Sequence, residues 1–293
     1  MGITEETKEI IKAIANGDLK AAKKAAIVVM LNDNTQKNRH FVNAYRPKLE
    51  LTAELKELPY KIAKFIYCID VENTFIPERY YETEFCKKIA NKIIRGNKVA
   101  GKLAELKIPY KNITLIHGEP GTGKTEFAKY LAYRMNLPLY YLNFSSVIDS
   151  RLGETQKNIK EIFDYLRGNP CILMMDEVDT ISCNRGKGSD VSEMSRVTIT
   201  LLQELDRLEN NTVLIAATNR IELLDKAFIS RCSLVEEMER LTEKETLEMI
   251  RKYTASINIL ISDSEAKKLI GLDTREILQK LIEIIAREWE KKD

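Results

Sequence analysis

Eight consecutive residues in the middle of the chain offer the clearest chemistry. Residues 118–125 run Gly-Glu-Pro-Gly-Thr-Gly-Lys-Thr and match the pattern G-x-x-x-x-G-K-[ST]. Glycines let backbone N–H groups turn inward around phosphate oxygens, and the start of the following helix adds favourable partial charge. Lys124 can reach the β- and γ-phosphates of a nucleotide, and Thr125 can ligate Mg²⁺. The residues expected to contact the nucleotide are Glu119, Pro120, Gly121, Thr122, Gly123, Lys124 and Thr125.

An apolar strand that ends in two carboxylates is the second candidate. Residues 171–175 are apolar, and Asp176 and Glu177 follow them directly. Neighbouring side chains of a strand point to opposite sides, so the two acids can take different roles. Asp176 would hold Mg²⁺, directly or through water, and Glu177 would polarise the attacking water as general base. Alone, such an ending is a common solvated strand terminus; beside a phosphate-binding loop it predicts hydrolysis.

Two polar residues further along the chain are weaker candidates. Asn219 follows the apolar run 213–217 and could orient the same water, although an asparagine in this place is more often a turn residue. Arg231 considered alone is an ordinary surface arginine.

The elements that must position these residues begin at about Tyr81, where short apolar runs alternate with amphipathic stretches. Strands are expected at 113–117, 139–144, 171–175, 213–217 and 234–238, and helices at 124–135, 155–166, 191–208 and 223–229. This alternation predicts an α/β fold with a parallel sheet covered by helices on both faces. Ligands of such sheets bind at the carboxyl ends of the strands.

The pattern divides the chain into three parts. Residues 1–80 are expected to form a helical N-terminal segment, with helices over 4–16, 19–31 and 49–70, the last interrupted at Pro59. Residues 81–240 are expected to form the α/β core. Residues 241–293 are expected to form a small all-helical lid, with helices over 242–253, 263–270 and 274–289.

Together these motifs resemble the AAA+ ATPases, and specifically the AAA clade proper, from about Tyr81 to the C-terminus. Residues 118–125 look like the Walker A motif of P-loop NTPases, and residues 172–179 look like Walker B. Residues 216–231 resemble the second region of homology that marks this clade. The resemblance implies that ATP and Mg²⁺ are the cofactors.

The resemblance also implies roles for three residues. Asn219 would be sensor 1, and Arg231 would be an arginine finger that reaches the ATP of a neighbouring subunit. Arg275 lies where sensor 2 of the lid falls, although it could equally be an ordinary charged residue at a helix start.

The family further implies a homo-hexameric ring that remodels or moves a protein partner by ATP hydrolysis. ATP would lie between core and lid at a subunit boundary, and each nucleotide state would move loops that line a central pore. The N-terminal segment would select the client or adaptor.

Two positions depart from the family pattern. The usual paired arginine followed by Phe-Asp is replaced by Ser-Arg-Cys-Ser at 230–233, and Arg151 replaces the aromatic residue of the first pore loop. Arg151 and the basic loop 184–190 motivate an alternative, a nucleotide-dependent DNA-associated loader or mobile-element accessory ATPase. A third hypothesis is a switch that assembles with ATP but barely hydrolyses it, and Glu177 argues against it.

Composition excludes several classes of protein. The 46 Lys and Arg against 44 Asp and Glu leave a formal charge of +2, which argues against a nucleic-acid binder held by bulk charge. Five cysteines without a CxxC pair, and only two histidines, argue against a disulfide framework or a zinc site. Since no apolar run approaches a membrane span and no signal-peptide pattern is seen, a cytoplasmic protein without membrane contact is expected.

Overall fold

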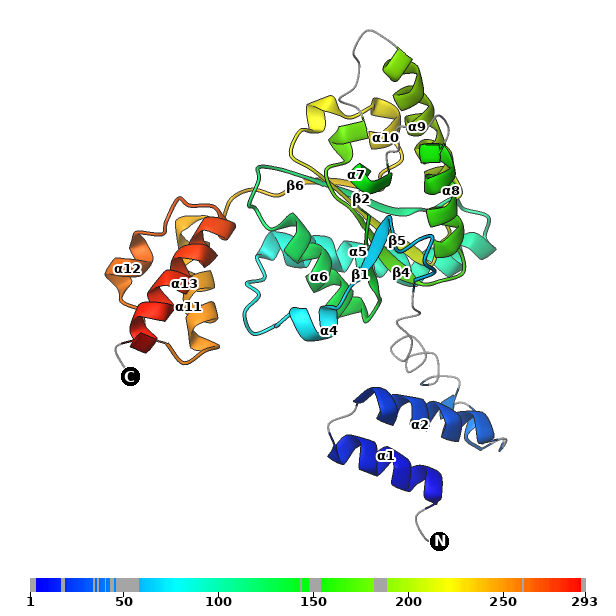
Figure 1. Cartoon of the computed structure of the whole chain (residues 1–293), viewed down its shortest axis with the longest axis horizontal. Coiled ribbons are helices and arrows are strands. Elements are labelled where there is room, and N and C mark those ends of the chain that lie inside the picture. The colour runs from blue at the N-terminus through cyan, green and yellow to red at the C-terminus, as the bar shows by residue number, and fades with distance from the viewer. Residues whose placement is uncertain are drawn as a thin grey trace.

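The computed structural model describes residues 4–16, 19–33, 35, 37–39, 41–42, 45, 58–142, 144–147, 154–181, 189–259 and 261–290. A mostly parallel sheet with helices on both faces makes up the larger part, and a bundle of helices at the C-terminal end stands beside it (Figure 1). The predicted α/β fold class is therefore confirmed.

Six strands form one sheet in the order β1-β3-β4-β5-β2-β6. The strands are β1 Ile66–Ile69, β2 Asn112–His117, β3 Leu139–Leu142, β4 Cys171–Met175, β5 Thr212–Thr218 and β6 Leu234–Glu237. Neighbouring strands run parallel except β1, which pairs antiparallel with β3 at one edge. The carboxyl ends of β2 to β6 therefore meet along one side of the sheet, which is where open α/β sheets bind ligands.

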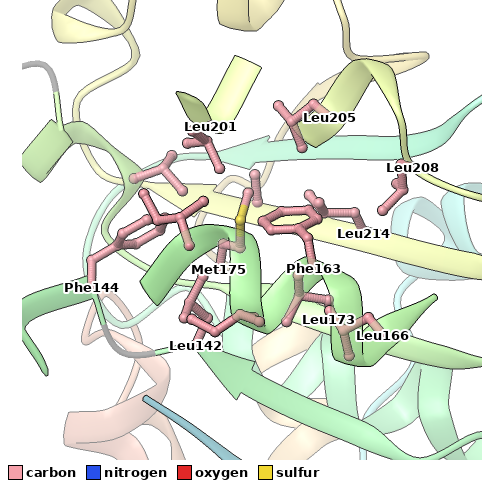
Figure 2. Packing of buried hydrophobic residues seen from close by; sticks show 14 of the residues in the cluster. Leu142, Phe144, Phe163, Leu166, Leu173, Met175, Leu201, Leu205, Leu208 and Leu214 are labelled. Carbon is pink, nitrogen blue, oxygen red and sulfur yellow. The ribbon is translucent and has the colours of Figure 1, made fainter. Parts of the chain in front are cut away.

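Alternating side chains of the strands fill two separate cores. Leu173 and Met175 of β4 enter one core, and Ile172 and Met174 enter the other. The first core is covered by α7 Phe144–Val147, α8 Glu154–Leu166 and α9 Ser189–Asp206, and the second by α5 Glu84–Glu105 and α6 Lys124–Met135. Figure 2 shows the first core, where Phe163 and Leu205 pack over strand residues such as Leu214. This double covering explains why the central strands are continuously apolar.

The N-terminal part is helical where it was expected to be, with one exception. Helices α1 Glu5–Ala15 and α2 Leu19–Asn32 pair as a hairpin, and the side chain of Thr4 caps the first. The helix predicted over 49–70 is wrong in its described part, because residues 60–65 form turns and Ile66–Ile69 form β1, which pairs with β3. Residues 46–57 lie outside the described part of the chain.

Short helices and the C-terminal bundle complete the fold. They are α4 Val71–Thr74, α10 Lys226–Ile229, α11 Glu243–Ala255, α12 Asp263–Lys267 and α13 Thr274–Glu290, with 3₁₀ turns at Val178–Ile181 and Ile221–Leu223. The last three helices enclose a small core of their own around Ile250, Ile277 and Leu281, as predicted for a helical lid. No helix among the described residues is long and apolar enough to cross a membrane.

Candidate nucleotide-binding and catalytic site

The predicted phosphate-binding loop connects β2 to α6 in the conformation that its glycines permit. Gly118, Gly121 and Gly123 all have positive φ, at 146°, 77° and 98°. A side chain at Gly118 is also excluded by packing, since its Cβ would lie 2.3 Å from the carbonyl oxygen of Met238. The loop is thus held against the carboxyl end of β6 while its N–H groups lead into α6.

Lys124 is folded into this loop. Its side chain is only 8% exposed, and its ammonium group donates to the carbonyl oxygens of Gly118 and Glu119, each at 2.8 Å. Burial lowers the pKa of Lys124, while the nearby carboxylates of Asp176 and Asp179 act in the opposite direction. The positive charge is therefore placed inside the loop, where phosphate oxygens would replace the two carbonyl acceptors.

Asp176 lies directly beyond β4 and faces the start of α6. The Thr125 hydroxyl donates to Asp176 Oδ2 at 3.3 Å, and the backbone N–H of Glu177 donates to Asp176 Oδ1 at 3.0 Å. A hydroxyl and a carboxylate side by side are the hard oxygen ligands that suit Mg²⁺. Among the described residues, no group of three or more His, Cys, Asp and Glu that could hold a metal ion is found.

Glu177 and Asn219 stand at the carboxyl ends of adjacent strands. Both are exposed, and β4 pairs with β5, so the two residues lie at the same edge of the sheet. That they contact one water stays a prediction. Glu177 has φ of 53°, an unusual conformation for a non-glycine residue. The two strand ends are tied together, because the hydroxyl of Thr218 donates to Asp179 at 2.7 Å.

Arg231 is bound within its own chain. Its Nε and Nη2 donate to the two carboxylate oxygens of Asp206, each at 2.8 Å, and Nη1 donates to the carbonyl oxygen of Ala227 at 2.7 Å. Asp206 is the last residue of α9 and lies far from Arg231 in the sequence. The contact between the two could therefore not be predicted from the sequence. The hydrogen bond and charge of Arg231 hold the pKa of Asp206 below its ordinary value. The role of Arg231 in a neighbouring site remains a prediction.

A cavity of about 600 Å³ opens beside the phosphate-binding loop, between core and lid. Its walls come from four places in the sequence: Phe75, Ile76, Arg79, Tyr80 and Tyr81 before α5; Thr122 and Gly123 of the loop; Met238 to Leu241 after β6; and Met249, Tyr253, Thr274 and Leu278 of the lid. The guanidinium of Arg79 lies 5.7 Å from the centre of the Tyr253 ring, and its Nε is buried without a hydrogen-bond partner in the described structure. Mixed aromatic, aliphatic and polar walls fit a base and sugar.

Apart from Thr122 and Gly123, sequence reasoning did not identify these cavity residues, since they are brought together only by the fold. Three contacts join the lid to the core at this place. The backbone N–H of Thr274 donates to Gly121 O at 3.1 Å, the hydroxyl of Tyr81 donates to Glu248 at 2.5 Å, and Arg240 binds both Glu119 and the carbonyl of Gly271.

The predicted sensor Arg275 follows Thr274 but is not among the residues that line the cavity. It is exposed, whereas Thr274 and Leu278 of the same helix are the α13 residues that line the cavity. A contact between Arg275 and phosphate therefore stays a prediction.

Tyr141 is a further residue of the site that the sequence analysis missed. Its ring is partly buried against the second core. Its hydroxyl, however, donates to Asp176 Oδ2 at 3.3 Å. Burial, followed by the charge of Asp176, raises the pKa of Tyr141 well above its ordinary value. The only available signal was position, since β3 neighbours the strand that carries Asp176.

Some predictions fall on residues outside the described structure. Arg151 of the predicted pore loop and residues 184–188 of the basic loop belong to this group.

Comparisons with known proteins agree with the geometry. The family described as "ATPase family associated with various cellular activities (AAA)" matches residues 114–240. The 26S proteasome regulatory subunit 8 homologs of Encephalitozoon cuniculi and Schizosaccharomyces pombe are each 30% identical to this chain, over 75% and 78% of its length. The peroxisomal ATPase PEX6 of Dictyostelium discoideum is 34% identical over 53% of the chain.

The matches cover only part of each relative. This chain spans 59% and 57% of the two proteasomal relatives and 14% of the peroxisomal one. The family match begins in β2 and includes the phosphate-binding loop, Asp176, Glu177, Asn219 and Arg231. Residues 114–240 of the chain form an AAA family ATPase domain.

Proposed function

We propose that the protein binds ATP in the cavity between core and lid, hydrolyses it, and uses the cycle to remodel or move a protein partner. The observation that carries the proposal is the contact between Thr125 and Asp176 at 3.3 Å, with Glu177 next to it and the phosphate-binding loop above. These residues come from two strand ends, and nucleotide hydrolysis needs all of them in one place.

Each residue has one task in this mechanism. The cavity takes the base and sugar, and Lys124 exchanges its two carbonyl partners for phosphate oxygens. Thr125 and Asp176 would hold Mg²⁺, which neutralises charge that develops on the phosphates. The carboxylate of Glu177 accepts the proton of the attacking water, and Asn219 helps to orient that water.

Ring assembly is the second part of the proposal. Arg231 lies at the surface, bound to Asp206, and would offer its guanidinium to the ATP of the next subunit in a homo-hexamer. The names of the proteasomal relatives support a protein partner. Arg151 and residues 185–187, on which the prediction of a nucleic-acid partner rests, lie outside the described structure.

Two substitutions test the proposal by separating binding from turnover. Lys124→Ala should abolish binding of a fluorescent ATP analogue. Glu177→Gln should keep binding and lower phosphate release by roughly 10²- to 10⁴-fold, because only the proton acceptor is lost. Wild-type protein that releases no phosphate, even when concentrated enough to assemble, would contradict the proposal.

A further inference from the structure

The edge strand β1 reaches the metal-ligand position through two tyrosines. Tyr67 of β1 and Tyr141 of β3 stand opposite each other in the antiparallel register. Their rings are stacked, with centres 5.0 Å apart and planes at 27°. The hydroxyl of Tyr141 then donates to Asp176 Oδ2 at 3.3 Å. An unbroken set of contacts thus runs from the sheet edge to the carboxylate proposed to hold Mg²⁺.

Asp176 needs such support because its two oxygens have to keep one orientation. Oδ1 accepts the backbone N–H of Glu177, which limits rotation of the carboxylate but leaves Oδ2 to be fixed by other groups. Thr125 and Tyr141 both donate to Oδ2. If Thr125 ligated Mg²⁺, the orientation of its hydroxyl would be set by the ion as well as by Asp176, whereas the hydroxyl of Tyr141 would be a donor positioned independently of the metal. Partners of metal ligands commonly set ligand orientation and affinity in this way.

The stacked pair also explains why the ring of Tyr141 stays in place. β3 has only β1 on its outer side, so the phenol would otherwise lie against solvent at the sheet edge. Tyr67 covers it while remaining 51% exposed itself. Aromatic pairs at this separation favour one relative orientation.

We propose that Tyr141 is a positioning residue that orients Asp176 for Mg²⁺, and that Tyr67 fixes Tyr141, so that strand β1 adjusts the Mg²⁺ dependence of nucleotide binding. The proposal rests on the proposed function, since it concerns the same site. It adds that the N-terminal side of the molecule, to which β1 belongs, has a direct route to the metal position.

The experiment measures binding of a non-hydrolysable fluorescent ATP analogue as a function of Mg²⁺ concentration. Tyr141→Phe keeps the ring and its stacking on Tyr67 but removes the hydroxyl. It should raise the Mg²⁺ concentration for half-maximal binding by about three- to tenfold and leave binding without Mg²⁺ unchanged. An effect that comes only from loosened packing would change both measurements.

Tyr140→Phe is the matched control. Tyr140 is the preceding residue of β3, but it lies on the opposite face, where its ring meets Tyr165 edge-on at 6.1 Å. The same loss of a phenol hydroxyl should leave the Mg²⁺ midpoint of this variant at the wild-type value.

Tyr67 tests the second step. Tyr67→Ala should shift the midpoint in the same direction by about two- to threefold, Tyr67→Phe should not shift it, and Tyr67→Ala combined with Tyr141→Phe should match Tyr141→Phe alone. A wild-type midpoint for Tyr141→Phe, or an additive double variant, overturns the inference. If the wild-type protein binds no Mg²⁺–nucleotide at all, the proposed function itself fails, which is a separate result.

Discussion

The ion pair with Asp206 orients the side chain of Arg231 but is weak enough to be exchanged for another partner. Both side chains are partly exposed, at 29% and 54%, so water competes for each of them. Pairs of this kind contribute only about 0.2–1 kcal/mol. Phosphate oxygens of a neighbouring nucleotide offer the same two-pronged partner with more charge, and exchange of Asp206 for phosphate is therefore cheap.

We expect the two halves of this pair to respond very differently to substitution. Arg231→Ala should lower ATP turnover of the assembled protein by roughly 10³-fold while nucleotide binding persists. Asp206→Asn should change turnover by less than about fivefold, since only the weak exposed pair is lost. Steady-state phosphate release at a concentration that supports assembly measures both.

Arg231→Lys is the control for charge alone. Lysine keeps the positive charge but lacks the planar fork, so turnover should stay well below wild type. Full turnover in Arg231→Ala would remove the arginine from the mechanism.

Among individual residues, those that belong to contiguous motifs could be identified from the sequence. Asp176 and Glu177 directly follow β4, and Lys124 and Thr125 begin α6 after the loop that follows β2, so these local motifs carry them into the site. Asp206, Tyr141 and Arg79 were not foreseen, because each meets its partner from a distant part of the chain. Nothing in local spacing distinguishes them from ordinary helix, strand and loop residues.

At the scale of the elements, residues 70–83 form a strap that lines one wall of the cavity. Aromatic rings of this strap pack against α6. Phe75, Tyr80 and Tyr81 of the strap line the cavity. The ring of Tyr80 stacks on Tyr130 of α6 at 4.6 Å and 15°, and Tyr130 also binds Glu82. The strap thus moves with the helix that follows the phosphate-binding loop.

Tyr130→Ala should loosen this attachment. The variant should lose about 3 kcal/mol of stability, since Tyr130 is buried, and should bind the ATP analogue more weakly because one wall of the cavity shifts. Tyr133→Ala, at the half-exposed rim of the same cluster, should lose much less. Chemical denaturation and an analogue titration give the two values; equal losses would contradict the strap's dependence on Tyr130.

The contact between the phosphate-binding loop and α13 depends on one glycine. Gly121 has φ of 77°, and a Cβ there would lie 2.4 Å from the Cγ of Asp273. Gly121→Ala should therefore separate the start of α13 from the loop, which limited proteolysis between core and lid should detect as faster cleavage.

Gly101→Ala provides the opposite case. Gly101 lies in α5 with nothing within 4 Å of the added methyl group, so the substitution should stabilise the protein by about 0.5–1 kcal/mol. If limited proteolysis cleaves Gly121→Ala no faster than the wild type, the lid accommodates the added methyl group without separating from the loop.

The helices and strands of the core were predictable because apolar residues recur with clearly different periods in the two. Five apolar runs separated by helices with one apolar face leave little choice, and α6 was predicted to the residue. β1 was not recognised, since Ile66–Ile69 is short and continues an apolar helical pattern. Its conformation is decided by pairing with β3, a tertiary effect that outweighs local preference.

At the scale of the whole molecule, the cavity is lined by residues of both the core and the lid. A ligand that touches both favours the folded, docked arrangement over all others. At a hundredfold excess over its Kd, ATP should raise the free energy of unfolding by about 2.7 kcal/mol. Thermal denaturation with and without nucleotide measures this as an upward shift of Tm.

Arg240→Ala should reduce that shift. Arg240 joins Glu119 of the loop to Gly271 of the lid, so its loss frees the lid from the bound nucleotide. Arg251→Ala is the matched control, because Arg251 pairs with Asp263 inside the lid. Equal shifts in both variants would mean that the lid adds nothing to binding.

The backbone conformation of Glu177 has opposite consequences for stability and for the proposed hydrolysis. A non-glycine residue at φ of 53° costs on the order of 1 kcal/mol, and the hydrolytic strand end carries that cost in every folded molecule. Asparagine or glycine would adopt this conformation more easily, yet neither carries a carboxylate for the water. Stability alone would favour replacing Glu177, whereas the proposed role as proton acceptor requires it, so the most stable version of this sequence and the version proposed to hydrolyse ATP differ at this position.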